Sequence, residues 1–267
     1  MTIKICQHGR DGFGHQLEGM LRLISLSLNN ENIEYVYSLK KNFMFEHSNF
    51  DLRKLNLYLL KALEILHLKH GKECNINNII FNEKTNPKFL NSNTIYCYDG
   101  VGDGSSLPST FENIENLQKS LPELRSAFIN SYLPPPSYSN KNKRNLVCHI
   151  RLGDAIGTRI LDNNKIFEFI KKYQTNNETK NETNIIIHTN GDISANFIEN
   201  ITIYDSKTDV LQILSDFIHA DILIMNYSSL SIAAHLLADD TQEVYCPSVA
   251  GPTFFKRILP KCKKIML

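Results

Sequence analysis

Short, continuously apolar runs alternate with helical patterns along the second half of the chain, and this alternation constrains the fold more than any other feature. The runs expected as strands are 145–150, 184–189, 201–204, 221–226 and 243–246, and the expected helices are 166–173, 210–219 and 230–238. Strands that are apolar on both faces are typical of a parallel sheet covered by helices on both sides. The pattern therefore predicts an α/β fold.

The first half of the chain begins with the same kind of unit. A strand ending at Cys6 leads through a glycine-rich turn into a helix over 15–28. Further strands are expected at 33–37 and 94–98, and further helices at 52–70 and 111–132. Three prolines at 134–136 and the polar residues after them neither continue a helix nor fit a central strand. We therefore expect a linker at about 134–144 between two Rossmann-like lobes, 1–136 and 145–267, with a cleft between them.

Composition excludes several classes of function. The 267 residues carry 29 Lys and Arg against 28 Asp and Glu, so charge favours neither nucleic acid nor a membrane surface as a partner. No run reaches the roughly 18 apolar residues of a membrane span, and no apolar signal core follows the start, which predicts a cytoplasmic chain without a transmembrane segment. The six cysteines form no C-x-x-C pair, so no zinc site is expected, and those in strand-like runs are expected as buried thiols.

Polar residues gather where three of the expected strands end, at 149–154, 189–192 and 226–229. Ligands bind parallel α/β sheets outside the carboxyl ends of the strands, so these segments are expected to lie together. The candidate ligand-binding residues in them are His149, Arg151, Asp154, Thr189, Asp192, Asn226, Ser228 and Ser229.

Two of these segments suit a phosphate group. Arg151, directly after a strand, offers a planar and permanently charged fork that matches a diphosphate; the alternative is an arginine in a surface ion pair with Asp154. Ser229 is placed to cap the helix that follows it, where backbone N–H groups favour anions; the alternative is an ordinary helix cap.

The glycine-rich turn at 9–16 is a third candidate. Its glycines allow a sharp turn and close approach to a ligand, although their spacing only loosely resembles G-x-G-x-x-G and a plain strand–helix turn is the alternative. Gly12, Phe13 and Gly14 are the candidate ligand-binding residues of this turn. Asp11 and His15 are its titratable side chains, and either is a candidate general base for an attacking hydroxyl.

Three stretches resemble the fucosyltransferase superfamily that carries an H-x-R-R-x-D type motif. Residues 12–17 look like its G-[FY]-G-x-Q-L turn, 149–158 are similar to H-V-R-R-T-D-K-V-G-T, and 217–229 look like an A-D-F-L…F-S-S segment. Within the superfamily the core α-1,6-fucosyltransferases and the rhizobial Nod-factor enzymes are the most similar.

The resemblance implies a GT-B-like fold, a GDP-fucose-like donor, inversion at the anomeric carbon and no metal requirement. Arg151 matches the arginine that holds the donor β-phosphate, and Ser228 and Ser229 match serines near that phosphate. The N-terminal lobe then faces the acceptor and the C-terminal lobe binds the nucleotide sugar. This chain departs from the motif by having Leu152 in place of its second arginine, and Ala155 and Arg159 in place of a lysine and a glutamate.

These observations lead to one functional hypothesis with two alternatives. The hypothesis is a glycosyltransferase without a cofactor that transfers fucose from GDP-fucose to a glycan acceptor by direct displacement, with Arg151 stabilising the leaving diphosphate and Asp11 or His15 as the base. One alternative is transfer of a sugar from another nucleotide. The other is a non-catalytic module that binds a sugar nucleotide or a glycan.

Overall fold

The computed structural model describes residues 2–7, 12–37, 51–68, 79–81, 95–98, 114–138, 143–152, 163–176, 183–191, 193, 201–226, 228–247 and 263–265. The chain divides into two compact units, one of residues 1–45 and 51–133 and the other of residues 46–50 and 134–267. Among the described helices, none combines the length and apolar character that crossing a membrane requires.

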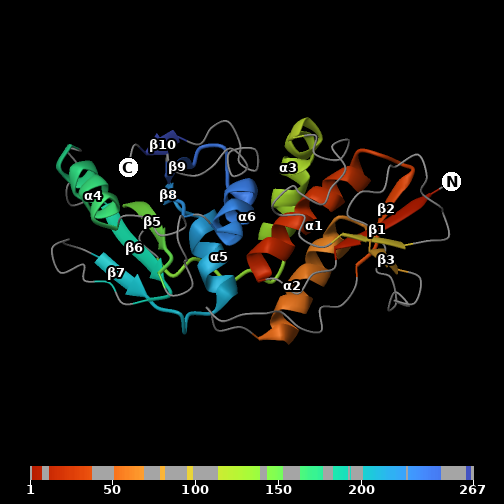
Figure 1. Ribbon diagram of the computed structural model, residues 1–267, viewed down its shortest axis with the longest axis horizontal. Coiled ribbons are helices and arrows are strands. Elements are labelled where there is room, and N and C mark those ends of the chain that lie inside the picture. The colour runs from red at the N-terminus through yellow and green to blue at the C-terminus, as the bar shows by residue number, and fades with distance from the viewer. Residues whose placement is uncertain are drawn as a thin grey trace. The chain divides into compact units, whose positions relative to one another are not determined.

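The second unit contains a sheet of six described strands, all parallel, in the order β10-β9-β8-β5-β6-β7 (Figure 1). Its strands are β5 (Arg144–Ile150), β6 (Thr183–Thr189), β7 (Ile201–Tyr204), β8 (Ile222–Ile224), β9 (Glu243–Pro247) and β10 (Lys263–Ile265), and its helices are α4 (Asn163–Asn176), α5 (Val210–Ile218) and α6 (Ser229–Leu237). In chain order this is the strand arrangement 6-5-4-1-2-3 of the doubly wound dinucleotide-binding fold. Strands β6 and β7 are therefore added on one side of β5, and β8, β9 and β10 are added on its other side.

Strand β5 packs against different helices on its two faces. Leu146, Cys148 and Ile150 belong to the apolar cluster that includes Ile166 and Ile170 of α4. His149, which points to the opposite face, contacts α5 and α6 instead. Because side chains alternate along a strand, the apolar run of β5 buries one face under α4 and the other under α5 and α6.

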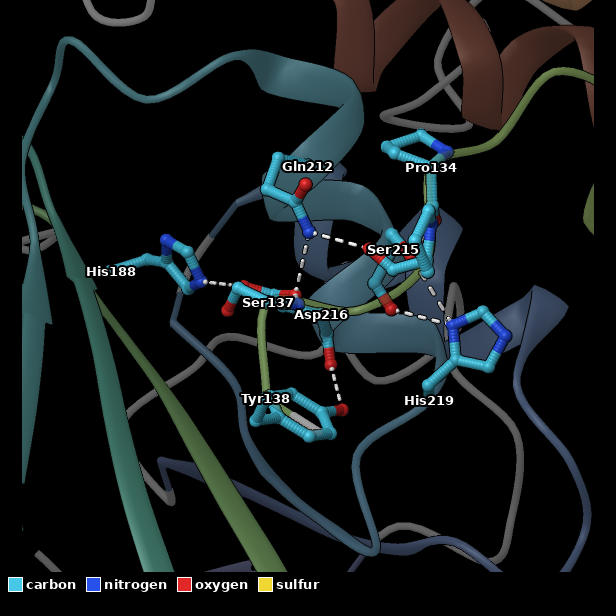
Figure 2. A network of polar contacts seen from close by, with 9 residues as sticks. Pro134, Ser137, Tyr138, His188, Gln212, Ser215, Asp216 and His219 are labelled. Carbon is cyan, nitrogen blue, oxygen red and sulfur yellow. Dashed lines mark hydrogen bonds and ion pairs between the residues drawn. The ribbon is translucent and has the colours of Figure 1, made fainter. Parts of the chain in front are cut away.

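A buried carboxylate joins α5 to the segment that enters this unit (Figure 2). Asp216 is fully buried, and it accepts hydrogen bonds from the Ser137 amide at 2.6 Å, the Ser137 hydroxyl at 2.7 Å and the Gln212 side chain at 3.0 Å. His188 Nε2 of β6 lies 2.9 Å from the same carboxylate. Burial alone would raise the pKa of Asp216, but the hydrogen bonds from His188 and Ser137 outweigh it and hold that pKa below its ordinary value.

The same helix holds the prolines that precede Ser137. Ser215 donates its hydroxyl to the Pro134 carbonyl, and Gln212 donates to the Pro135 carbonyl at 2.9 Å. Tyr138 donates its hydroxyl to the Asp216 carbonyl at 2.8 Å. Residues 134–138 of the expected linker are therefore fastened along α5, and β5 begins at Arg144.

The first unit has a parallel sheet in the order β2-β1-β4-β3. Its strands are β1 (Ile3–Gln7), β2 (Ile33–Tyr35), β3 (Ile79–Phe81) and β4 (Ile95–Tyr98), and its helices are α1 (Phe13–Leu28), α2 (Leu52–Ile65) and α3 (Ile114–Ile129). Helix α1 is the next described element after β1, and Phe13, Leu17 and Met20 on it are completely buried. Most residues of this helix are buried, so it supplies much of the core of the first unit.

Three features differ from the sequence predictions. Helix α2 ends at Ile65 and not at residue 70, because His67 has a φ of 53° and the Leu68 amide donates to the Leu63 carbonyl, which closes the helix with a Schellman motif. Strands β3 and β10 were not predicted, since each has three residues and little pattern. Cys148 and Cys246 are buried thiols, as expected, whereas Cys6 is disulfide-bonded.

Candidate functional site

The strand order places a candidate site at the carboxyl ends of β5 and β8. In an open parallel sheet, a crevice forms between two neighbouring strands whose following connections lead to opposite sides of the sheet. Here that position lies between β5, which leads into Arg151, and β8, which leads through Asn226 to α6. Thr189 ends β6, the other neighbour of β5. The described residues of the three polar segments predicted from the sequence therefore lie at the carboxyl ends of neighbouring strands of one sheet.

Two hydrogen bonds connect these segments directly. His149 Nδ1 lies 2.6 Å from the hydroxyl of Ser231, in the first turn of α6. The Leu152 amide donates to the side-chain oxygen of Asn190 at 2.6 Å. The end of β5 is thereby tied to the start of α6 on one side and to the end of β6 on the other.

His149 is an uncharged member of the site. Burial lowers the pKa of its imidazole to about 3, and the nearby positive charges of Arg151 and of His188, when protonated, contribute in the same direction. The ring lies 5.2 Å from the ring of Phe217, measured between centroids. At neutral pH the permanent positive charge at the end of β5 is therefore that of Arg151, which is half-buried.

The start of α6 corrects one prediction. Ser228, not Ser229, is the capping residue: its backbone is extended and its hydroxyl accepts a hydrogen bond from the Leu230 amide at 3.3 Å. Ser229 is the first residue of the helix. Two adjacent serines both suit a cap, and the extended backbone at Ser228 decides which one takes that position. Asn226 is buried at the end of β8, and its carbonyl accepts from the Ser228 amide at 2.8 Å.

Leu152 has a packing role at this edge. It packs against the apolar cluster under α4, and a methyl group added to Gly191 would lie only 2.8 Å from its Cβ. Thr189 stabilises the turn that contains Gly191, since its hydroxyl donates to the Gly191 carbonyl at 2.9 Å. The position that would carry the second arginine of the resembled motif is therefore used here for an apolar contact with a glycine.

The N-terminal candidates lie in the first unit. Gly12 precedes α1 as its cap residue, without a side-chain cap, and its carbonyl accepts from the His15 amide at 3.1 Å. Phe13 is completely buried and Gly14 is buried, so both contribute to packing, whereas His15 is partly exposed in the first turn. Asp11, Asp154 and Asp192 lie outside the described residues.

Sequence reasoning missed Ser231. The signal for it was His149 within the apolar part of β5, because a buried polar side chain requires a partner. Asn190 lies inside the polar segment 189–192 predicted from the sequence, although it was not named as a candidate residue. His188, interpreted as a core histidine with a satisfied partner, bonds to Asp216 through Nε2; its Nδ1 has no partner in the described part of the chain. The described residues contain no cluster of three or more side chains suited to hold a metal ion.

Comparison with solved structures identifies the architecture. The chain aligns over its full length with 91% of the E. coli ADP-heptose LPS heptosyltransferase II, at 9% identity and a TM-score of 0.52. The chain has a GT-B fold. Its α/β class and the GT-B-like fold implied by the sequence resemblance are thus confirmed.

Two other solved structures are also similar. The glycosyl transferase family 9 protein of Veillonella parvula matches 99% of this chain and 85% of its own, at 10% identity and a TM-score of 0.49. The NodZ α-1,6-fucosyltransferase, soaked with GDP-fucose, matches 89% of this chain and 93% of its own, at 8% identity and a TM-score of 0.42. No family model and no curated protein matches the sequence.

The contact between Gly191 and Leu152 predicts a specific coupling. We expect Gly191→Ala to lower the free energy of unfolding by about 1–3 kcal/mol, because the new methyl group overlaps the Leu152 Cβ. Adding Leu152→Gly removes that Cβ and should recover part of the loss, whereas adding Leu152→Ala keeps the Cβ and should not. Urea unfolding of the single and double variants measures both effects, and strictly additive changes would contradict the prediction.

The lowered pKa of His149 predicts acid sensitivity. Between pH 6.5 and about 3 the unfolded chain binds a proton at this position and the folded chain does not, so stability must fall as pH falls through that range. We expect His149→Gln to show a weaker fall than the wild type between pH 6.5 and 4.5. One proton corresponds to about 1.4 kcal/mol per pH unit, which is an upper bound because His149 is not fully buried. Equal pH slopes in denaturant titrations would refute this assignment.

Proposed function

We propose that the chain is a glycosyltransferase that binds the diphosphate of a nucleotide sugar at the carboxyl ends of β5 and β8. Arg151 and the first turn of α6 hold the diphosphate, and Thr189, Asp192 and Asp154 line the neighbouring part of the site. A glycan hydroxyl attacks the anomeric carbon, and the sugar–phosphate bond breaks with the electron pair leaving on the nucleoside diphosphate.

The observation that carries this proposal is the hydrogen bond between His149 and Ser231 at the reversal point of the sheet. It brings an arginine and a helix N-terminus, which come from distant parts of the chain, to one strand edge. Guanidinium groups pair with phosphates in a bidentate manner, and helix N-termini favour anions through their dipole and backbone N–H groups. A single diphosphate satisfies both.

The same groups supply the chemistry. Negative charge develops on the leaving diphosphate in the transition state, and a fixed arginine with oriented N–H groups stabilises it without a metal or another cofactor. The acceptor hydroxyl must lose its proton, and we assign this step to Asp11 or to His15, which lies in the first turn of α1. The first unit then presents the acceptor, and the second unit, from residue 145 to the end, binds the donor.

The donor we favour is GDP-fucose, because the sequence segments that contain Arg151 and Ser228 resemble those of the fucosyltransferase superfamily. A second candidate is another nucleotide sugar, and the similarity to the E. coli ADP-heptose heptosyltransferase makes ADP-heptose the first to test. A non-catalytic sugar-nucleotide-binding module is the third, since Leu152 leaves only one arginine of the resembled motif.

Arg151→Ala tests the proposal. We expect a loss of roughly 10²–10³ in turnover, because one charge-assisted contact to the leaving group disappears. Stabilisation of the protein by the nucleoside diphosphate should fall as well, which a thermal shift assay measures.

Arg144→Ala is the matched control, because Arg144 lies at the opposite end of the same strand and pairs with Glu243 at 2.7 Å. It should retain wild-type turnover and nucleotide binding, with a stability change below about 1 kcal/mol. Near-wild-type turnover in Arg151→Ala would rule out this diphosphate site.

Nucleotide selectivity separates the three candidates. We expect GDP and GDP-fucose to raise the melting temperature of the wild type more than ADP, ADP-heptose, UDP or UDP-sugars at equal concentration, since only a bound ligand stabilises the folded state. Preference for ADP compounds would assign the second candidate. Tight binding of a nucleotide sugar with no hydrolysis or transfer in the presence of glycan acceptors would assign the non-catalytic module.

A further inference from the structure

We infer that Ser231 is a positioning residue: its hydrogen bond to His149 sets the distance between the Arg151 guanidinium and the first turn of α6. The inference rests on the proposed function, since it concerns the same diphosphate site. It assigns a role to Ser231. It also changes the role of His149 from a residue that binds the sugar nucleotide to the hydrogen-bond partner that holds the end of β5 in place.

His149 and Ser231 are both held in place by contacts within the second unit. Ser231 is fully buried in α6, and its hydroxyl lies 2.6 Å from His149 Nδ1. The imidazole packs on Phe217 of α5, with 5.2 Å between ring centroids. The ring is thus fixed by one hydrogen bond and one aromatic contact from two helices. Arg151 follows two residues later and lies close enough to lower the pKa of the ring.

The backbone of the sheet does not supply this link. Register pairs between β5 and β8 run from Leu146 and Ile222 to Cys148 and Ile224, and none is described beyond them. Beyond Ile224 the chain continues to pair with β9 on its other side, since the Met225 amide donates to the Tyr245 carbonyl at 2.8 Å. The side-chain bond from His149 to Ser231 is therefore a direct hydrogen-bonded connection between the end of β5 and α6 that the strand pairing does not provide.

A diphosphate held between the two groups is sensitive to their separation. Displacements of about 1 Å at a catalytic contact can lower rates by as much as about 100-fold. His149 remains neutral at physiological pH, so the bond to Ser231 is not broken by protonation. Both features suit a fixed spacer better than a group that exchanges protons during the reaction.

Ser231→Ala is the direct test, with Ser25→Ala as its matched control. Ser25 is equally a buried helical serine with a side-chain partner, Ser120 at 3.2 Å, and it lies in the first unit. The readouts are the Kd of GDP, ADP and UDP by calorimetry, and kcat and KM with the sugar nucleotide that the wild type accepts. We expect Ser231→Ala to weaken binding of the accepted nucleotide and to lower kcat/KM by about tenfold, while Ser25→Ala does neither.

Two further variants separate positioning from stability. Ser231→Thr keeps the hydroxyl and should recover most of the binding lost in Ser231→Ala. In the Arg151→Ala background, Ser231→Ala should cause no further loss of nucleotide affinity, because Ser231 acts through the position of that arginine. A purely structural role would instead lower the melting temperature of Ser231→Ala and leave nucleotide affinity unchanged in both backgrounds.

The outcomes distinguish this inference from the proposed function. If Arg151→Ala weakens nucleotide binding but Ser231→Ala behaves like Ser25→Ala, the positioning role is overturned and the diphosphate site stands. If Ser231→Ala and Arg151→Ala lower affinity independently and additively, the positioning role is likewise overturned. If GDP, ADP and UDP all fail to bind the wild type, both the site and the positioning role are overturned.

Discussion

A parallel sheet that is covered on both faces leaves few places for polar side chains, and this constraint organises the second unit. Within the strands, a buried polar side chain needs a hydrogen-bond partner, because it would otherwise lose its contact with water without compensation. His149 forms a hydrogen bond with Ser231 of α6. His188, which is opposite His149 in the pairing of β5 and β6, forms a hydrogen bond with Asp216 of α5. Each histidine thus fixes a different helix to the sheet. Other polar groups lie beyond the strand ends, where a ligand can reach them.

The second of these pairs determines where the chain enters the unit. Asp216 is ionised although it is fully buried, since hydrogen bonds from His188 and Ser137 outweigh the effect of burial on its pKa. A buried charge with several donors is sensitive to the loss of any one of them. The segment 134–138 therefore has a defined position along α5, and the proline-rich composition that predicts a linker also describes a chain that is hydrogen-bonded to its own unit.

The sequence predicted the helices of the second unit and its described strands except β10, because the central strands β5, β6 and β8 are apolar on both faces and each helix has an apolar stripe. It also predicted that the polar segments after β5, β6 and β8 would meet, and their described residues lie at the same ends of neighbouring strands. It could not identify Ser231, which lies 82 residues from its partner, or choose between Ser228 and Ser229 as the cap. Those choices depend on helix placement and on backbone angles, neither of which has a local sequence signal. The roles of Arg151, Asp11 and His15 in catalysis remain predictions.

The residues at the end of β5 have two different functions, and Leu152 is the one that serves packing. His149 contacts α5 and α6 on one face of the strand, and Leu152 packs on the other side against the cluster under α4 and against Gly191. An arginine at 152 would have to leave that packing and would meet a turn already closed by Thr189 and Asn190. Of the two arginines in the resembled motif, this chain therefore has only Arg151. In the proposed diphosphate site one cation takes the place of two. We therefore expect the spacing set by the bond between His149 and Ser231 to matter more here than in a site with a second arginine.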